Sequence, residues 1–381
     1  MRVSRRGEVD PFIVMDVVRA AQEAEAKGQR IIHMEVGQPG TPAPRGATQA
    51  LGRVMGDDAL GYSVSLGLTP LRNGIARLYG EWYDVDLNPA RVVVTPGSSG
   101  AFMLAFTSLF DAGEKVGIGV PGYPSYRQIL KAASLDPVLI ETQAKDRFQP
   151  VPEDVAAHGL DGLLVASPGN PTGTMLGRDA LGNLMTACRD SGAAFISDEI
   201  YHGLEYEAPA VTALSIADDA YVINSFSKYF SMTGWRVGWM VVPEDHVRRI
   251  ERIAQHLFIC APHASQITAL AALECREELD RNLATYAVNR DLMIDGLPKA
   301  GFDRFAPPDG GFYIYADVSH LTDDSLSLAR ELLDRAGVAV TPGMDFDPVR
   351  GKKTLRFSYC ASSDDIREGL RRLAEYMAQR G

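Results

Sequence analysis

Seven short runs rich in β-branched and apolar residues, separated by segments with helical patterning, are the feature that most constrains this fold. They begin at residue 91 and read, in chain order, RVVVT, KVGIGV, PVLIE, GLLVAS, AFISD, YVINS and RVGWMVV. Strands that alternate with helices predict a parallel sheet covered on both faces. We therefore expect an α/β fold whose large domain has a seven-stranded, mostly parallel sheet sandwiched by helices.

The C-terminal part of the chain has a different pattern. The strand-like segments GFDRF, GGFYIYADV, VAVTP and KTLRFSYC are interrupted by helical patterns at 325–336 and 363–379, which predicts a smaller α+β domain. The N-terminal stretch PFIVMDVVRAAQEAEAKG has apolar residues at helical spacing and a stop at Gly28, and we expect this helix to pack on the small domain. The predicted division is a large domain at 46–280 and a small domain made of 1–45 and 281–381.

Composition excludes several classes of protein. With 381 residues, 46% of them hydrophobic, the chain is long enough for two domains with sizeable cores. A formal net charge of −11 and the absence of a basic tail argue against nucleic-acid binding. No apolar run approaches the roughly 18 residues of a membrane helix, and no signal peptide is evident. We expect a cytoplasmic protein that binds neither nucleic acid nor membrane.

Neither the cysteines nor the histidines suggest a metal site. The four cysteines are far apart, form no CxxC motif and are expected to be buried free thiols: Cys188, Cys260, Cys275 and Cys360. The seven histidines show no ligand spacing such as HExxH.

Lys228 is the strongest candidate for a reactive group. It follows the YVINS run in SFSKYFSMTGW, where apolar and aromatic neighbours surround it. A lone lysine on a loop is usually a solvated surface charge, but desolvation favours the neutral amine, which is a nucleophile and can form a Schiff base. Arg236, eight residues later, stays charged and calls for an anion in the same cleft.

The loop TPGSSGAF offers a place for that anion. Ser98 and Ser99 are expected to cap the helix that follows, and the free amides of Ser99 and Gly100 with the helix dipole would form a phosphate seat. Taken alone, this pattern is only a helix start. Ser225, directly after the YVIN strand, and Arg236, at the start of RVGWMVV, would be brought to the same sheet edge and complete the seat.

Three further polar side chains stand at strand ends or mid-strand. Asp198 ends the AFISD run, with Tyr201 shortly after it, and needs a cationic partner such as a structural arginine or a protonated pyridine nitrogen. Asn170, before a proline in SPGNPTG, reads as a turn residue or as a fixed donor to a phenolate or carboxylate. Arg356, mid-strand in KTLRFSYC, suits either a structural salt bridge or a bidentate carboxylate.

One motif points elsewhere. Gly117, Gly119 and Gly122 spell the dinucleotide fingerprint GxGxxG. The first two glycines lie within a predicted strand, and PGYPSY is expected to open a loop rather than a helix, so nicotinamide binding is not predicted.

The motifs together resemble the aspartate aminotransferase family, the class I/II aminotransferases among fold-type I pyridoxal-phosphate enzymes. The resemblance covers nearly the whole chain, and the combination of SxSK, GWRxG and NPxG is its most specific part. The matching blocks are, in order, PFIVMDVVRAA, HMEVGQPGTPAP, GYSVSLGLTPLRNGIA, TPGSSGA, PGYPSY, SPGNPTG, SDEIYHG, SFSKYFSMTGWRVGW, GGFYIY, VAVTPG and LRFSYC.

The resemblance implies roles for these residues. Lys228 would carry the pyridoxal 5′-phosphate aldimine and shuttle the proton, Asp198 would face the pyridine nitrogen, and Tyr201 with Asn170 would hold the phenolic oxygen. The remaining cofactor residues implied by the family are Ser98, Ser99, Gly100, Ser225 and Arg236 at the phosphate, Tyr123 stacked on the ring, and Tyr62 from a neighbouring subunit. Arg356, Asn170 and the backbone of Gly37 would bind the substrate carboxylate. Tyr123 replaces the tryptophan of aspartate-specific members.

The predicted function is therefore a pyridoxal-phosphate-dependent aminotransferase, a homodimer with its sites at the interface, which moves an amino group from an L-amino acid to a 2-oxo acid by a ping-pong mechanism. A C–S β-lyase or decarboxylase of the same fold shares these anchors and is the alternative within the cofactor class. A cofactor-binding regulatory module is a third reading. Aromatic, aliphatic and small neutral substrates all stay open.

Overall fold

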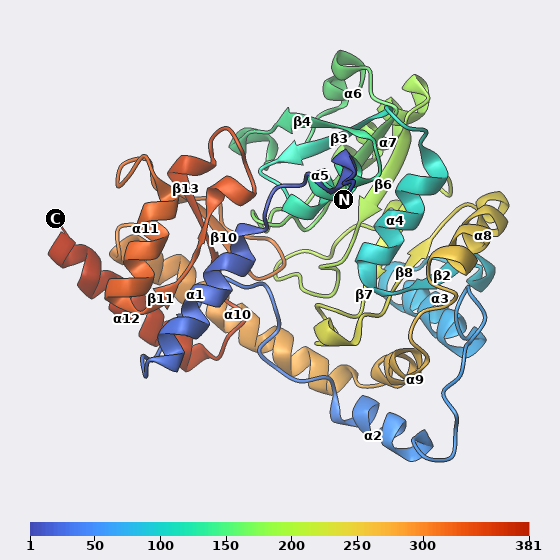
Figure 1. Cartoon of the computed structure of the whole chain (residues 1–381), viewed down its shortest axis with the longest axis horizontal. Helices are drawn as coiled ribbons and strands as arrows, with labels where there is room; N and C mark the ends of the chain where they lie inside the picture. The colour runs from blue at the N-terminus through green and yellow to red at the C-terminus, as the bar shows by residue number, and fades with distance from the viewer. Residues whose placement is uncertain (381) are drawn as a thin grey trace.

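The structure, a computed structural model, describes residues 1–380 and contains a seven-stranded sheet, a four-stranded sheet and a two-stranded pair (Figure 1). The larger sheet has the seven predicted strands, in the spatial order β2-β8-β7-β6-β5-β3-β4. Their bounds are β2 (Val92–Thr95), β3 (Lys115–Val120), β4 (Asp136–Glu141), β5 (Gly162–Ala166), β6 (Ala194–Asp198), β7 (Tyr221–Ser225) and β8 (Gly238–Val241). Only β8 runs antiparallel to its neighbours, which confirms the predicted α/β fold with a mostly parallel sheet.

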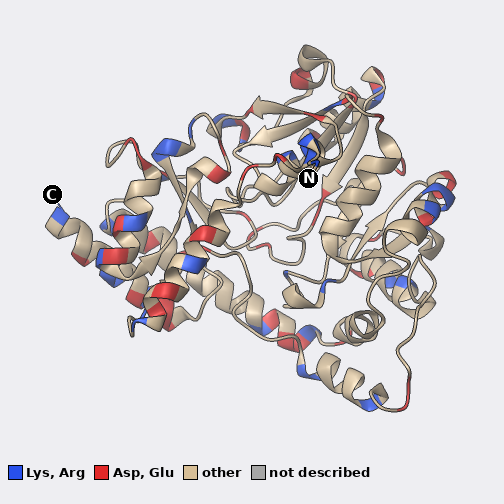
Figure 2. Ribbon diagram, in the orientation of Figure 1, with Lys and Arg blue, Asp and Glu red and all other residues tan. Residues whose placement is uncertain are grey.

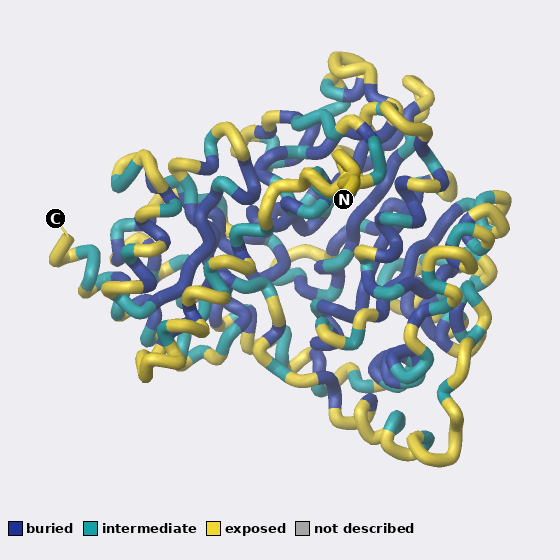
Figure 3. Tube along the Cα trace, viewed as in Figure 1, coloured by how far each residue is buried: buried dark blue, intermediate teal, exposed yellow. Residues whose placement is uncertain are grey.

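Helices cover both faces of this sheet because its strands are apolar on both sides. One face packs against α4, α5 and α8, and the other against α3 and α7. The helices around this sheet are α2 (Arg45–Val54), α3 (Thr69–Tyr83), α4 (Gly97–Leu109), α5 (Pro124–Ala132), α6 (Pro152–His158), α7 (Arg178–Ser191), α8 (Val247–Leu257) and α9 (His263–Ala272). We call this sheet with its helices the large lobe. Its strands are mostly buried (Figure 3), except the edge strand β4, in which only Ile140 is buried.

A four-stranded antiparallel sheet, ordered β12-β13-β10-β9, forms the second lobe. Its strands are β9 (Arg304–Phe305), β10 (Tyr313–Asp317), β12 (Thr341–Pro342) and β13 (Thr354–Ser358), and beside it β1 (Ile32–His33) pairs with β11 (Val338–Ala339). Its helices are α1 (Ile13–Ala26), α11 (Ser325–Glu331), continued by a π-helical turn at Leu332–Ala336, and α12 (Ser363–Arg380). We call this unit the small lobe.

The N-terminal and linking helices follow the predicted pattern. Helix α1 is followed by Gly28 at φ 88°, a left-handed conformation that glycine adopts readily, and the helix packs on β11 and β12. Helix α10 (Arg276–Lys299) runs between the lobes and crosses residue 280, where the sequence division was placed (Figure 1). The boundaries 46–280, 1–45 and 281–381 stay a prediction.

Basic and acidic residues are interspersed along the helices of both lobes in the ribbon of Figure 2. No helix within residues 1–380 is long and apolar enough to cross a membrane. All four cysteines are free; Cys188 and Cys360 are buried as predicted, whereas Cys260 and Cys275 are only partly buried, so that prediction was wrong for two of them.

Candidate active site

A cavity of about 210 Å³ lies between the lobes, at the edge of the large sheet where β6 and β7 end. Ten of the predicted site residues line it: Gly37, Ser98, Ser99, Tyr123, Asn170, Asp198, Tyr201, Lys228, Arg236 and Arg356. They come from loops far apart in sequence, which the parallel strands bring to one edge.

The amine of Lys228 lies in this cavity. Its Nζ donates a hydrogen bond of 2.7 Å to the carbonyl oxygen of Gly37 and lies 5.8 Å from the ring centre of Tyr201. Burial lowers the pKa of Lys228 to about 8, and the guanidinium groups of Arg356 and Arg236 act in the same direction. A substantial fraction of this amine is therefore neutral near physiological pH, as a nucleophile or general base requires.

Most of the apolar neighbours of Lys228 in the sequence are buried. Phe226, Tyr229, Phe230 and Met232 are buried in the large-lobe core, and Phe226 packs against Phe230 with ring centres 4.6 Å apart. The four neighbours are therefore buried rather than solvent-facing, while Trp235 and Lys228 itself are only partly buried.

Asp198 occupies the last position of β6 and is 3% exposed. The hydroxyl of Tyr126 donates to its Oδ2, and the amide of Ile200 donates to Oδ1 at 3.1 Å. Burial raises the pKa of the Asp198 carboxyl to about 6, although both hydrogen bonds act in the opposite direction. Among the described residues no arginine forms an ion pair with Asp198, so the structural ion-pair reading is wrong. Its charge is left to face the cavity.

The N-terminus of helix α4 faces the cavity. The prediction that Ser98 and Ser99 cap this helix was wrong. The N-cap residue is Pro96, and no side chain caps the helix, so Ser98 and Ser99 lie inside the first turn. Gly97 begins the helix at φ 69°, and a Cβ there would lie 2.5 Å from an Nη of Arg236. Glycine therefore lets this guanidinium approach the free amides of the first turn, which forms an anion-binding corner.

Three predicted cofactor residues do not line the cavity. Gly100 is buried within α4. Ser225 is 1% exposed, lies 2.8 Å from the hydroxyl of Ser227 and donates to the carbonyl of Val237. Ser227, which was not predicted, lines the cavity instead. Tyr62 lies outside the cavity and is 82% exposed.

Arg356 is held rigidly at the centre of β13. Its Nη1 donates to Oδ1 of Asn170 at 3.0 Å, and its Nη2 donates to the carbonyl of Glu35 and, at 3.3 Å, to Oγ1 of Thr341. The side chain is 2% exposed, yet its Nε is buried without any partner within residues 1–380. No salt bridge neutralises this guanidinium there, so the structural salt-bridge reading is wrong. An unneutralised buried cation favours binding of a carboxylate.

Aromatic rings fix this arginine from two sides. The guanidinium lies 4.5 Å from the ring centre of Tyr313 and 4.7 Å from that of Phe346. The hydroxyl of Tyr313 also lies 2.8 Å from that of Tyr201. A Cβ at Gly37 would lie 1.5 Å from the same hydroxyl, so only glycine fits there. Tyr313 and Phe346 were not predicted; the adjacent motif GGFYIY was the available signal for Tyr313.

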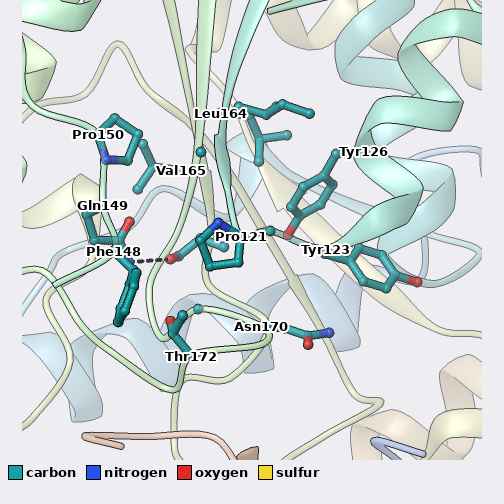
Figure 4. A pocket seen from close by; sticks show the side chains of 15 residues that line it. Pro121, Tyr123, Tyr126, Phe148, Gln149, Pro150, Leu164, Val165, Asn170 and Thr172 are labelled. Carbon is teal, nitrogen blue, oxygen red and sulfur yellow. Dashed lines mark hydrogen bonds between the residues drawn. The ribbon is translucent and has the colours of Figure 1, made fainter. Parts of the chain in front are cut away.

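Tyr123 and Tyr126 also line a smaller cavity of about 30 Å³, whose lining side chains are drawn in Figure 4. Both tyrosines project from the start of α5, with ring centres 5.2 Å apart, and Asn170 lies below them. Gln149 donates to the carbonyl of Ala166 at 3.0 Å, the dashed line in the figure, and so braces the end of β5. Tyr126 was not predicted as a site residue, although it follows Tyr123 by nearly one helical turn.

The GxGxxG motif does not form a nucleotide-binding turn. Gly117 and Gly119 lie inside β3, as predicted. The expectation that PGYPSY opens a loop rather than a helix was wrong, because α5 begins at Pro124 within that stretch.

Comparison with known proteins decides the family. The model of the family "Aminotransferase class I and II" matches residues 29–373. The chain belongs to this family. The aminotransferase function predicted from the sequence is thereby confirmed, and enzymes of this family use pyridoxal 5′-phosphate.

Individual relatives cover the whole of this aminotransferase. A valine–pyruvate aminotransferase of Mycobacterium tuberculosis is 44% identical over 99% of this chain and 98% of its own. A putative aminotransferase from Silicibacter pomeroyi has a solved structure that is 65% identical, with a TM-score of 0.96 and full coverage of both chains. An aspartate aminotransferase from Thermus thermophilus, solved with maleate, is 28% identical with a TM-score of 0.92, and covers 98% of this chain and 100% of its own.

Proposed function

We propose that this aminotransferase holds pyridoxal 5′-phosphate on Lys228 and moves the amino group of a neutral, aliphatic L-amino acid to a 2-oxo acid by a ping-pong mechanism. The observation that carries the proposal is a partly neutral amine and a buried carboxylate, Lys228 and Asp198, that share one cavity with an anion-binding corner. A single ligand with an aldehyde, a basic ring nitrogen and a phosphate matches all three.

The donor set fits this cofactor. The first turn of α4 with Arg236 would bind the phosphate, Asp198 would accept a hydrogen bond from the protonated ring nitrogen, and Tyr123 would cover the ring. When bound, the cofactor withdraws electrons from the substrate Cα and so acidifies its proton.

Side chains of the protein would carry out and support the proton transfer. Tyr126 donates to Oδ2 of Asp198 and so favours the ionised carboxylate, which would hold a ring nitrogen opposite it in the protonated form. Lys228, once its amine is free, is positioned as the general base that removes the Cα proton and returns it. The hydroxyl pair of Tyr201 and Tyr313 supplies a polar wall with donors for an oxygen at the ring edge.

Arg356 would bind the substrate carboxylate. Its donors to Asn170 and Glu35 are in use, while its Nε is buried and has no partner in the described chain. A carboxylate at this guanidinium would satisfy that donor and neutralise the buried charge.

The rest of the wall favours an apolar side chain. Phe12, Val14 and Met15 face the cavity from the start of α1. Within residues 1–380, the basic side chains in the wall are Lys228 and the two arginines already assigned to phosphate and carboxylate, which leaves none for a second substrate carboxylate. The name of the valine–pyruvate relative agrees with an aliphatic donor.

A second copy of this chain would complete the site. Five large apolar side chains in and near the loops beside α2 and α8 are strongly exposed: Met55, Tyr62, Val64, Leu257 and Ile259. The two loops are tied to each other, since Ser65 donates to the carbonyl of Ile259 at 2.5 Å and Gly61 bonds to His263. An exposed apolar surface of this kind favours a homodimer in which Tyr62 reaches the partner's phosphate corner.

A half-reaction screen tests the proposal. Purified holoenzyme is mixed with each of the twenty amino acids without a 2-oxo acid, and conversion of the aldehyde form of the cofactor to its amine form is followed by absorbance. Valine, leucine and isoleucine should convert it fastest, and Lys228→Ala should convert none at a comparable rate. Failure of every amino acid to convert the wild-type cofactor would refute the proposal, and faster conversion by aspartate than by valine would refute the substrate class.

A further inference from the structure

The connection between β12 and β13 contains six residues, 345–350, that contact both lobes, and we call this segment the clasp. It begins at the end of the 3₁₀ turn η8 (Gly343–Asp345) and ends before η9 (Gly351–Lys353). Its backbone belongs to the small lobe, between two strands of the four-stranded sheet. Its side chains, however, reach the carboxyl ends of β3 and β4 in the large lobe.

Arg350 makes the contact across the lobes. Its Nη1 donates to the carbonyl of Thr142 at 2.8 Å and its Nη2 to that of Val120 at 2.6 Å, the residues at or just past the ends of β4 and β3. Its Nε donates to Oδ2 of Asp347 at 2.6 Å. The guanidinium therefore uses its planar fork to join two large-lobe carbonyls to one small-lobe carboxylate, which a lysine cannot do.

Asp347 holds Arg350 in that orientation. The carboxylate is 1% exposed, and its Oδ1 accepts hydrogen bonds of 2.9 Å from the amides of Val349 and Arg350. Within residues 1–380, every hydrogen-bond partner of this carboxylate lies in the clasp, so the carboxylate folds this turn and aims the arginine outward. A buried carboxylate of this kind is stable only while its cation and amide partners stay in place.

The clasp touches the substrate-binding machinery at its other end. The carbonyl of Phe346 accepts a hydrogen bond of 3.0 Å from the amide of Gly122, directly before Tyr123 in the cavity wall. The ring of the same phenylalanine lies 4.7 Å from the guanidinium of Arg356. One residue of the clasp thus joins the cofactor-facing tyrosine to the carboxylate-binding arginine.

Helix α1 is attached to the same segment. Oδ2 of Asp345 accepts the amide of Val14 at 3.0 Å, and Val14 belongs to the apolar wall of the cavity. Three walls of the site, carrying Tyr123, Arg356 and Val14, therefore depend on the position of six residues that are themselves fixed to the large lobe by Arg350.

We propose that Arg350 is a positioning residue for the substrate carboxylate: by fixing the clasp to the ends of β3 and β4, it sets the position of Arg356 relative to the cofactor wall. This inference rests on the proposed function for the role of Arg356. Arg350 touches neither substrate nor cofactor, and it acts on binding rather than on proton transfer.

The test compares three variants of the holoenzyme. Arg350→Met keeps the length of the side chain and removes all donors, and Arg350→Lys keeps the charge without the fork. Arg304→Met is the matched control, because Arg304 and Arg350 both line a second cavity, of about 840 Å³. Among residues 1–380, the Arg304 side chain donates only to Ser319, at 3.4 Å. Steady-state kinetics measure KM and kcat separately, and hydrogen exchange measures the amides of Gly122 and Val14.

For Arg350→Met we expect the KM for the amino acid to rise about tenfold while kcat changes less than about twofold, because ground-state binding is what is lost. Exchange at Gly122 and Val14 should accelerate by about tenfold as the segment loosens. Arg350→Lys should give intermediate values, and Arg304→Met should match wild type in both readouts. Thermal unfolding confirms that each variant is folded.

Two results would overturn the inference: an unchanged KM in folded Arg350→Met, or a loss confined to kcat. If wild type itself converted no amino acid, the proposed function would fail separately. In that case the exchange rates at Gly122 and Val14 would still decide whether Arg350 holds the clasp.

Discussion

Nη1 of Arg356 donates a hydrogen bond of 3.0 Å to Oδ1 of Asn170, a residue 186 positions earlier in the chain and in the other lobe. The side-chain oxygen of Asn170 is thereby committed to the arginine, and its amide group remains available as a donor toward the cavity. A neutral amide at this position orients the guanidinium without neutralising it, which leaves the charge for a substrate.

This arrangement predicts that a negative charge at position 170 impairs substrate binding more than loss of the side chain does. Asn170→Asp keeps the shape but places a carboxylate 3.0 Å from the guanidinium, so we expect the KM for the amino acid to rise by more than about tenfold. Asn170→Ala leaves the cation free but less well oriented, and a smaller rise follows. Steady-state kinetics on both variants measure the difference. A lower KM in Asn170→Asp than in Asn170→Ala would contradict the assignment of Arg356 to the carboxylate.

Tyr126→Phe should shift the acid limb of the pH profile. The Tyr126 hydroxyl lowers the pKa of Asp198, which burial otherwise raises to about 6, so its removal raises that pKa further. Asp198 then takes up a proton at a higher pH and no longer holds the ring nitrogen in its charged form. We expect the acid limb of kcat/KM to move to higher pH and the cofactor to bind about tenfold more weakly.

The pH profile and a cofactor titration measure both effects in Tyr126→Phe. Tyr221→Phe is the control, since Tyr221 lies on β7 and bonds to His246 at 2.8 Å, outside the residues that line the cavity. An acid limb at the wild-type position in Tyr126→Phe would show that Asp198 is not the group that titrates there.

Lys228→Met should stabilise the apoprotein at neutral pH. The folded pKa of Lys228, about 8, is below its ordinary value of 10.5, so the folded state bears the cost of a buried ammonium at every pH below 8. As the pH rises from 8 to 10.5, the folded lysine loses its proton before the unfolded one does, and this cost disappears. Methionine is uncharged, so the variant avoids this cost at every pH.

We expect apo Lys228→Met to exceed the wild type in free energy of unfolding by on the order of 1 kcal/mol at pH 7, since this lysine is only partly buried. The difference should shrink as the pH approaches 10.5. Urea unfolding of both apoproteins at several pH values measures it. A gap that widened with increasing pH would mean that the burial cost was assigned with the wrong sign.

Mixed dimers test the role proposed for Tyr62. Lys228→Ala and Tyr62→Ala chains should each be impaired alone. In a mixed dimer, the site with an intact Lys228 would receive an intact Tyr62 from the other chain. Equal mixing after subunit exchange should then restore about a quarter of the native sites. Absence of any recovery, with exchange confirmed by mass, would show that Tyr62 does not act across an interface.

Much of this site was predictable from sequence, because its main residues lie at or just after the ends of strands. Asp198, Asn170 and Lys228 each follow or end a parallel strand, and such strands deliver their carboxyl ends to one edge regardless of helix details. The seven-stranded sheet was also predictable, because its strands are short apolar runs separated by segments with helical patterning.

Contacts that depend on packing could not be predicted in this way. Tyr201 and Tyr313 are 112 residues apart and meet only because the two lobes adjoin. Tyr126 was missed because α5 begins directly after Tyr123, where a loop rather than a helix was expected. The serine caps at Ser98 and Ser99 failed because Gly97, at φ 69°, starts the helix earlier.

The single antiparallel strand of the large sheet has one more consequence. Because β8 returns beside β7, Lys228 and Arg236 stand at opposite ends of one hairpin connection rather than on separate crossovers. The spacing between the reactive amine and the guanidinium is thus a local dimension, set by the length of that turn.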